Sequence, residues 1–328
     1  MDLPVSDPAH LPVYVEQPGR HLFVSMADPA AMDAAAPFFR EGLPRDARDR
    51  SMAPLAQWLP RQVAPQPDYS DISVIFQVSR CGSTLLARNI AQHEDALVLS
   101  EPPFFAALHG RFAAIEQGPA AMRVSLAMLE PWRLRAKAMG KRLVLKLSSS
   151  LNPFMPALLE AMPGARALAL HREPLAVLES LDRSPSVSLR AQGERQPSAL
   201  LPELRPLEED RSLLIAADRY IRSVSAMQTA PDTVLRVDYD DLADAYPDIL
   251  DHLGLDRHGG PRWSSAGDAK ARWVGQAREY TPAPGERLAG FAARHADLLA
   301  IVRRHHSPMA RAREARRSTL HNPIENCA

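Results

Sequence analysis

"FQVSRCGSTLLARNI", residues 76–90, decides how the central part of this sequence folds. It ends the apolar run ISVIFQV (72–78), passes through the short polar segment 79–84 and continues with apolar residues at helical spacing. This order predicts a buried strand, a tight turn and the start of a helix. Because a helix N-terminus offers backbone N–H groups and the positive end of a dipole, the turn can hold an anion such as phosphate or sulfate.

Strand and helix patterns alternate along the chain from residue 70 onward. The expected strands cover 72–78, 96–100, 142–147, 166–171 and 233–239. The expected helices cover 83–92, 119–138, 153–162, 174–183 and 208–228, with further helices near 240–254 and over 286–305. Strands separated by helices of this length need crossover connections, so we expect an α/β fold with a parallel β-sheet flanked by helices on both faces.

The remaining segments indicate how the chain is divided. Residues 1–68 are punctuated by proline and predict an N-terminal extension of loops and short helices, at 28–37 and 51–59, packed on the core. Residues 69–328 are expected to form a single domain. Within it, 184–206 carries four prolines, and its length predicts a functional loop or lid.

Composition argues against several classes of protein. Among 328 residues, 39 basic ones balance 39 acidic ones, which does not suit an electrostatic nucleic-acid binder. The two cysteines, Cys81 and Cys327, cannot build a disulfide framework and fit a reducing compartment. We find no apolar stretch of about 18 residues and no signal-peptide pattern, so no membrane span is expected and the expected location is the cytoplasm. The oligomeric state is not indicated.

The turn at 79–84 can be compared with three kinds of anion-binding loop. The alternative to all three is an ordinary helix start that binds no ligand. A nucleoside-triphosphate loop, G-x-x-x-x-G-K-[ST], needs glycine and lysine where the sequence has Gln77 and Ser83. A cysteine-based phosphatase needs arginine at the position of Ala87, so Cys81 is interpreted as a small turn residue. The pattern R-x-G-[ST]-[ST] is met by Arg80, Cys81, Gly82, Ser83 and Thr84.

In that form the segment resembles the 5′-phosphosulfate loop of sulfotransferases that use 3′-phosphoadenosine 5′-phosphosulfate (PAPS), with a motif layout like that of their tyrosylprotein-type and bacterial branch. The resemblance covers 70–255 and implies the P-loop-like α/β architecture of that family. A second matching element is ALALHREPLAVLESL (167–181). It implies that Arg172 at the strand end and Ser180 on the next helix grip the 3′-phosphate, whose charge suits a guanidinium and a hydroxyl. Otherwise, Arg172 caps the sheet edge and Ser180 faces solvent.

Two further elements lie at the ends of other expected strands. RLVLKLSSS (142–150) places Lys146 near the carboxyl end of an apolar strand, where α/β proteins hold ligands and where a buried ammonium needs an anion. The resemblance implies that Lys146 contacts the sulfate or the bridging oxygen, unless it only reaches solvent at the sheet edge. In LVLSEPPFF (97–105) it implies that Glu101 is the base that accepts the acceptor's proton.

Weaker signals concern histidines and the C-terminal region. The rival bases are His93 and His109, each expected at the surface. The pair His305-His306 lacks acidic or cysteine neighbours at ligand spacing, so we expect no metal there. AKARWVGQAREY takes the place of the family's basic loop over the nucleotide, and its candidate contacts are Lys270, Arg272 and Trp273.

Together, the resemblance implies an enzyme that transfers a sulfuryl group in line from PAPS to a hydroxyl or amine of a small molecule, a glycan or a peptide. Arg80 and Lys146 would stabilise the sulfuryl oxygens, and Glu101 would take the proton, without a metal. Two alternatives stay open. A nucleotide-dependent kinase of related fold would need the lysine that is missing after Gly82, and a non-catalytic nucleotide- or anion-binding protein would not need all four elements together.

Overall fold

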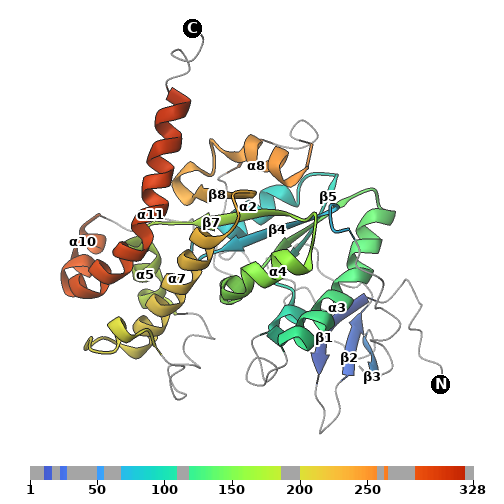
Figure 1. Ribbon diagram of the computed structural model, residues 1–328, viewed down its shortest axis with the longest axis horizontal. Helices are drawn as coiled ribbons and strands as arrows, with labels where there is room; N and C mark the ends of the chain where they lie inside the picture. Colours follow the sequence, from blue (N-terminus) through green and yellow to red (C-terminus); the bar gives the residue numbers. More distant parts are fainter. Residues whose placement is uncertain are drawn as a thin grey trace.

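A five-stranded parallel sheet forms the centre of the computed structural model (Figure 1). Its strands are β4 (Ile72–Gln77), β5 (Ala96–Ser100), β6 (Arg142–Lys146), β7 (Arg166–His171) and β8 (Val234–Asp238). The structure describes residues 11–16, 23–27, 50–54, 68–108, 118–185, 200–256, 262–264 and 285–321. All five expected strands are therefore confirmed, with ends within one residue of the predicted ones.

Helices cover both faces of this sheet. In Figure 1, α2 and α8 lie on one side, and α3, α4 and α7 lie on the other. The helices that follow or connect the strands are α2 (Ser83–Ile90), α3 (Gly118–Ala138), α4 (Met155–Ala161), α5 (Pro174–Arg183), α7 (Arg211–Thr229) and α8 (Tyr246–Leu253). Short 3-10 helices are η4 (Pro103–Leu108), η5 (Ser149–Phe154), η6 (Pro202–Leu204) and η7 (Tyr239–Asp241). The predicted α/β class is confirmed.

The strand order β5-β6-β4-β7-β8 places the turn after β4 at the centre of the sheet edge. All six residues of β4 are buried, because the strand has a neighbour on each side and helices above and below. From β4 the chain builds first toward β5 and β6 and then, on the other side, toward β7 and β8. In such sheets ligands bind at the carboxyl ends of the strands where the direction of winding changes.

The N-terminal region differs from expectation. Its described residues form an antiparallel sheet of β1 (Leu11–Glu16), β2 (Phe23–Ala27) and β3 (Arg50–Pro54). The helix expected over 51–59 is wrong at 51–54, since pairing with β2 outweighs the local helical pattern. The other expected helix, 28–37, lies outside the described residues. Trp132 Nε1 of α3 donates to the Pro12 carbonyl at 2.7 Å, which ties this sheet to the main body.

The C-terminal helix expected over 286–305 is two helices, α10 (Gly285–Arg294) and α11 (Ala296–His321). The break falls at His295, whose ring packs on Phe291 and whose Nδ1 lies 2.7 Å from Glu209 Oε2. These contacts fix the chain direction between the helices, and α11 then runs past α7 toward the C-terminus (Figure 1). No helix in the described parts combines the length and the apolar character that crossing a membrane requires.

Candidate active site at the carboxyl edge of the sheet

The turn after β4 is shaped by backbone conformations that few residues adopt. Gly82, the N-cap of α2, has φ +78°, and a Cβ there would lie 2.6 Å from Cε2 of Tyr239. Arg80 has φ +62°, which is uncommon for a residue with a side chain. The glycine therefore lets the turn lie directly on the Tyr239 ring, and it leaves the first turn of α2 without a capping side chain.

The burial of three residues agrees with the interpretation of this segment as a turn followed by an uncapped helix start. These residues are Cys81, Ser83 and Thr84. Cys81 is fully buried, and burial raises the pKa of its thiol to about 12, so the thiol stays protonated at neutral pH. This agrees with a small turn residue and not with a nucleophile. Ser83 is buried and Thr84 is half-buried at the first two positions of α2.

Glu101 and Lys146 make direct contact at the ends of β5 and β6. Lys146 Nζ lies 2.6 Å from Glu101 Oε1, and the backbone N–H of Glu101 donates to the Lys146 carbonyl at 2.7 Å. The lysine side chain is 1% exposed and the glutamate side chain is 30% exposed. Glu101 has φ +56°, another rare conformation that is held by these two bonds. The anion that a buried lysine requires is thus Glu101 in this structure.

Arg172 binds the turn from the end of β7. Its guanidinium donates to the Arg80 carbonyl at 3.1 Å and lies 4.0 Å from the centre of the Tyr239 ring. Its own carbonyl accepts the hydroxyl of the buried Tyr220 at 2.6 Å. The charges of Lys146 and Arg172 both act to lower the pKa of Cys81, against the larger effect of burial, so both cations surround the turn.

Arg80 and Ser180 lie near the start of the predicted lid. The Arg80 guanidinium donates to the Ser184 carbonyl at 2.5 Å, just after α5 ends. Ser180 is half-buried in the second turn of α5, the helix that follows Arg172. Most of the lid (184–206) lies outside the described residues, as do the predicted nucleotide contacts Lys270, Arg272 and Trp273.

One rival base, His93, was expected at the surface but is buried. His93 is not a surface residue: it is 1% exposed, and its Nε2 lies 2.9 Å from the hydroxyl of Tyr246 in α8. Its Nε2 is therefore engaged within the core, whereas its Nδ1 is buried without a hydrogen-bond partner among the described residues. The other rival, His109, lies outside the described residues.

Sequence reasoning missed the two tyrosines beside Arg172. Tyr239 directly follows β8, and Tyr220 lies in α7. The position of Tyr239 at the end of an expected strand was a usable signal, since all strand ends of a parallel sheet point to the same edge. Nothing in the local pattern of the α7 helix distinguished Tyr220 from an ordinary core residue.

Comparisons with known proteins give structural similarity only. No protein-family model and no curated protein matches the chain. The sulfotransferase domain of the curacin biosynthetic pathway is 16% identical with a TM-score of 0.39, over 69% of this chain and 96% of that one. A sulfotransferase from Alicyclobacillus acidocaldarius is 20% identical with a TM-score of 0.36, over 74% of this chain and 97% of that one. Because these TM-scores are low, the fold assignment rests on the sheet topology described above.

Proposed function

We propose that this chain is a PAPS-dependent sulfotransferase with its active site at the carboxyl edge of the parallel sheet. The observation that carries the proposal is the Lys146–Glu101 ion pair, which joins two strand ends next to the turn before α2. It provides a cation and a carboxylate side by side. Sulfuryl transfer needs both, one for the oxygens of the transferred group and one for the acceptor's proton.

The donor's 5′-phosphosulfate would lie on the turn at 79–84. The open first turn of α2 and the hydroxyls of Ser83 and Thr84 offer donors to the 5′-phosphate. Arg80 has five N–H groups, so it can keep the Ser184 carbonyl and also contact a sulfuryl oxygen. This contact would couple donor binding to the first residue of the lid.

Arg172 and Ser180 would bind the donor's 3′-phosphate. The guanidinium of Arg172 is held in place by the Arg80 carbonyl on one side and by the Tyr239 ring on the other. Such prior fixing lowers the entropy lost when a phosphate binds, and a guanidinium can bind two phosphate oxygens at once. We assign Lys270, Arg272 and Trp273 to the same nucleotide as further contacts.

Binding of the donor would break the Lys146–Glu101 ion pair, so that each residue takes a separate role. The sulfuryl group takes over Lys146 Nζ, which stabilises its equatorial oxygens and the bridging oxygen. Glu101 is then released to accept the proton of the acceptor's hydroxyl or amine. The bond from the acceptor atom to sulfur forms as the bond from sulfur to the phosphate oxygen breaks, and adenosine 3′,5′-bisphosphate leaves.

The first test is calorimetric titration of the full chain with adenosine 3′,5′-bisphosphate, with ATP as the competing ligand. We expect micromolar binding of the bisphosphate, weaker binding of ATP, and at least a tenfold loss of affinity in Arg172→Ala, equivalent to about 1.4 kcal/mol. Arg166→Ala is the matched control, because Arg166 is exposed at the opposite end of the same strand.

Three results would contradict the proposal. They are absence of bisphosphate binding, a preference for ATP, and equal losses in the two arginine variants. A preference for ATP would favour a kinase. If the bisphosphate binds, release of bisphosphate from PAPS in the presence of phenols, amines, glycans and peptides then tests transfer and separates an enzyme from a binding protein.

A further inference from the structure

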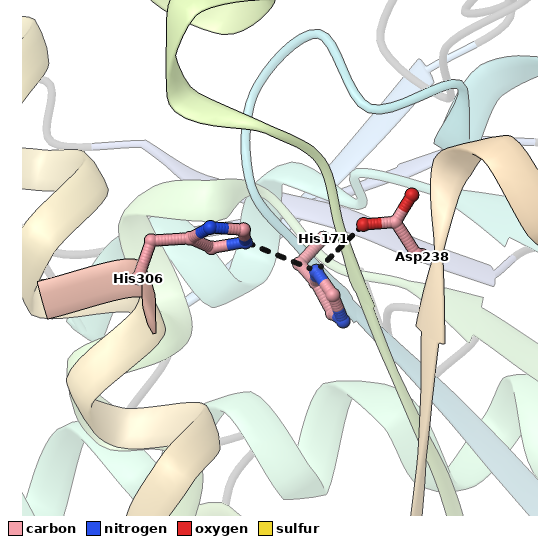
Figure 2. A group of neighbouring side chains, drawn as sticks. All are labelled: His171, Asp238 and His306. Carbon is pink, nitrogen blue, oxygen red and sulfur yellow. Dashed lines mark hydrogen bonds and ion pairs between the residues drawn. The ribbon is translucent and has the colours of Figure 1, made fainter. Parts of the chain in front are cut away.

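A second cluster of side chains lies at the same edge of the sheet, and it consists of His171, Asp238 and His306 (Figure 2). His171 is the last residue of β7, Asp238 is its register partner at the end of β8, and His306 reaches them from α11. Their exposed fractions are only 2%, 5% and 6%. Three elements that are far apart in sequence therefore bury two imidazoles and a carboxylate together.

The two contacts in this cluster converge on one atom. His171 Nδ1 lies 3.3 Å from Asp238 Oδ2 and 3.4 Å from His306 Nε2 (Figure 2). A ring nitrogen carries either a proton or a lone pair. With a proton, His171 Nδ1 can donate to Asp238 and at most share that proton with the lone pair of His306 Nε2; with a lone pair, it can accept from His306 but faces the lone pairs of the carboxylate. One proton therefore serves both contacts only as a shared, three-centre hydrogen bond.

The same distances suit three atoms that share a metal ion. Two ligands that are each about 2.0–2.1 Å from a tetrahedral zinc ion lie about 3.3–3.4 Å apart. Both separations in the cluster have this length, and one ligand atom from each of the three residues lies within 4.8 Å of the others. Neutral imidazoles and a carboxylate are also the donor types that divalent transition metals take.

We propose that His171, Asp238 and His306 bind a divalent transition-metal ion, and that Zn²⁺ is the ion their geometry fits best. A water molecule supplies the fourth position, as at other sites with three protein ligands. Asp238 Oδ2 faces the cluster, while its Oδ1 accepts from the Asp240 N–H at 3.0 Å and forms an ion pair with Arg313 at 3.2 Å. Contacts outside the cluster thus hold this second oxygen and orient the carboxylate toward the proposed ion.

The charge of Arg313 does not oppose the ion strongly, because Arg313 also forms a two-pronged pair with Asp241, at 2.7 and 2.9 Å. The ion would fasten α11 to the ends of β7 and β8. Those ends continue directly into Arg172 and Tyr239, so the ion would fix the backbone from which both project. Its ligands contact no part of the Lys146–Glu101 pair in the described structure, so metal binding can be tested separately from the function proposed above.

The test is titration of the full, chelator-treated chain with Zn²⁺, in competition with a chromophoric chelator, and a parallel titration with Co²⁺. We expect one equivalent to bind, and the Co²⁺ form to show the visible absorption of a four-coordinate site with nitrogen and oxygen ligands. In His306→Gln and in Asp238→Asn, the affinity should fall by about a hundredfold or more.

His305→Gln is the matched control, because it makes the same change one residue earlier on the same helix, where the ring contacts Glu203 instead. It should bind the ion as tightly as the unchanged chain. Absence of binding by the unchanged chain would overturn the proposal, as would unchanged affinity in His306→Gln and Asp238→Asn or an equal loss in all three variants. Circular dichroism establishes that each variant is folded; if His306→Gln does not fold, Asp238→Asn and the Co²⁺ spectrum decide.

Discussion

Two clusters of titratable side chains lie at the carboxyl edge of one sheet, and they differ in their access to solvent. Glu101 and Lys146 join the ends of β5 and β6, and the glutamate remains 30% exposed. His171 and Asp238 join the ends of β7 and β8 in the same way, but α11 covers them. The comparison shows that a strand end places a side chain at the edge of the sheet. Whether solvent or a substrate can then reach that side chain depends on the helix that covers it.

The chemistry of the two clusters follows this difference. A buried lysine whose partner glutamate reaches solvent can exchange that partner when a substrate arrives, which suits a reaction. Two histidines and an aspartate closed off from solvent suit a ligand that stays in place. Each of the following changes separates a reacting group from one that only supports the structure.

The largest effect is expected for Glu101→Gln, which keeps the size of the side chain but removes the base. We expect release of bisphosphate from PAPS to fall by about 10²–10⁴, the usual contribution of a positioned base. Affinity for the bisphosphate, measured by calorimetry, should stay within about threefold. The control is Glu160→Gln, on the exposed side of α4. Unchanged turnover in Glu101→Gln would leave the ion pair a purely structural role.

The next effect concerns the turn itself, where burial distinguishes Cys81 from a reactive thiol. With a pKa of about 12, the native thiol at pH 8 should react with iodoacetamide about a thousandfold more slowly than in the urea-unfolded chain. The native rate should also keep rising tenfold per pH unit to about pH 11, whereas the unfolded rate levels off near pH 9. The Cys327→Ser background leaves a single thiol to measure. Fast labelling of the native chain would show that the turn is open.

Lys146→Met tests the other half of the ion pair. Loss of the cation should lower turnover by about 10²–10³, as loss of one group that stabilises developing charge usually does. Methionine fills the buried space without a charge to desolvate, and Glu101 can turn to solvent. The free energy of unfolding, measured with urea, should therefore change by less than about 1 kcal/mol. Lys137→Met on α3 is the exposed control. A large loss of stability with normal turnover would show that Lys146 supports the structure and takes no part in the reaction.

Sequence patterns predicted the central sheet well because each strand is a short apolar run that ends at a polar residue. They also placed Lys146 and Glu101 at strand ends, although not in contact, because the crossing from β5 to β6 brings them together only in the folded chain. The strands β1 to β3 were missed: β1 and β2 pair as near neighbours in a segment whose prolines favoured loops, whereas β3 pairs with residues far from it in sequence. As with β3, His306 could not be connected with His171 and Asp238 because its partners lie far away in the sequence.

The smallest effect is expected for the glycine that shapes the turn, and it separates backbone strain from packing. Gly82→Ala forces a side chain into φ +78° and against the Tyr239 ring, whereas Gly140→Ala meets similar strain at φ +67° with no atom within 4 Å. Urea unfolding should show a loss of about 1 kcal/mol for Gly140→Ala and about 2–4 kcal/mol for Gly82→Ala. Because Tyr239 supports Arg172, the affinity for the bisphosphate should fall only in the Gly82 variant. Equal losses of stability in the two variants would mean that Tyr239 can move aside, and the support of Arg172 by that ring would then be incidental.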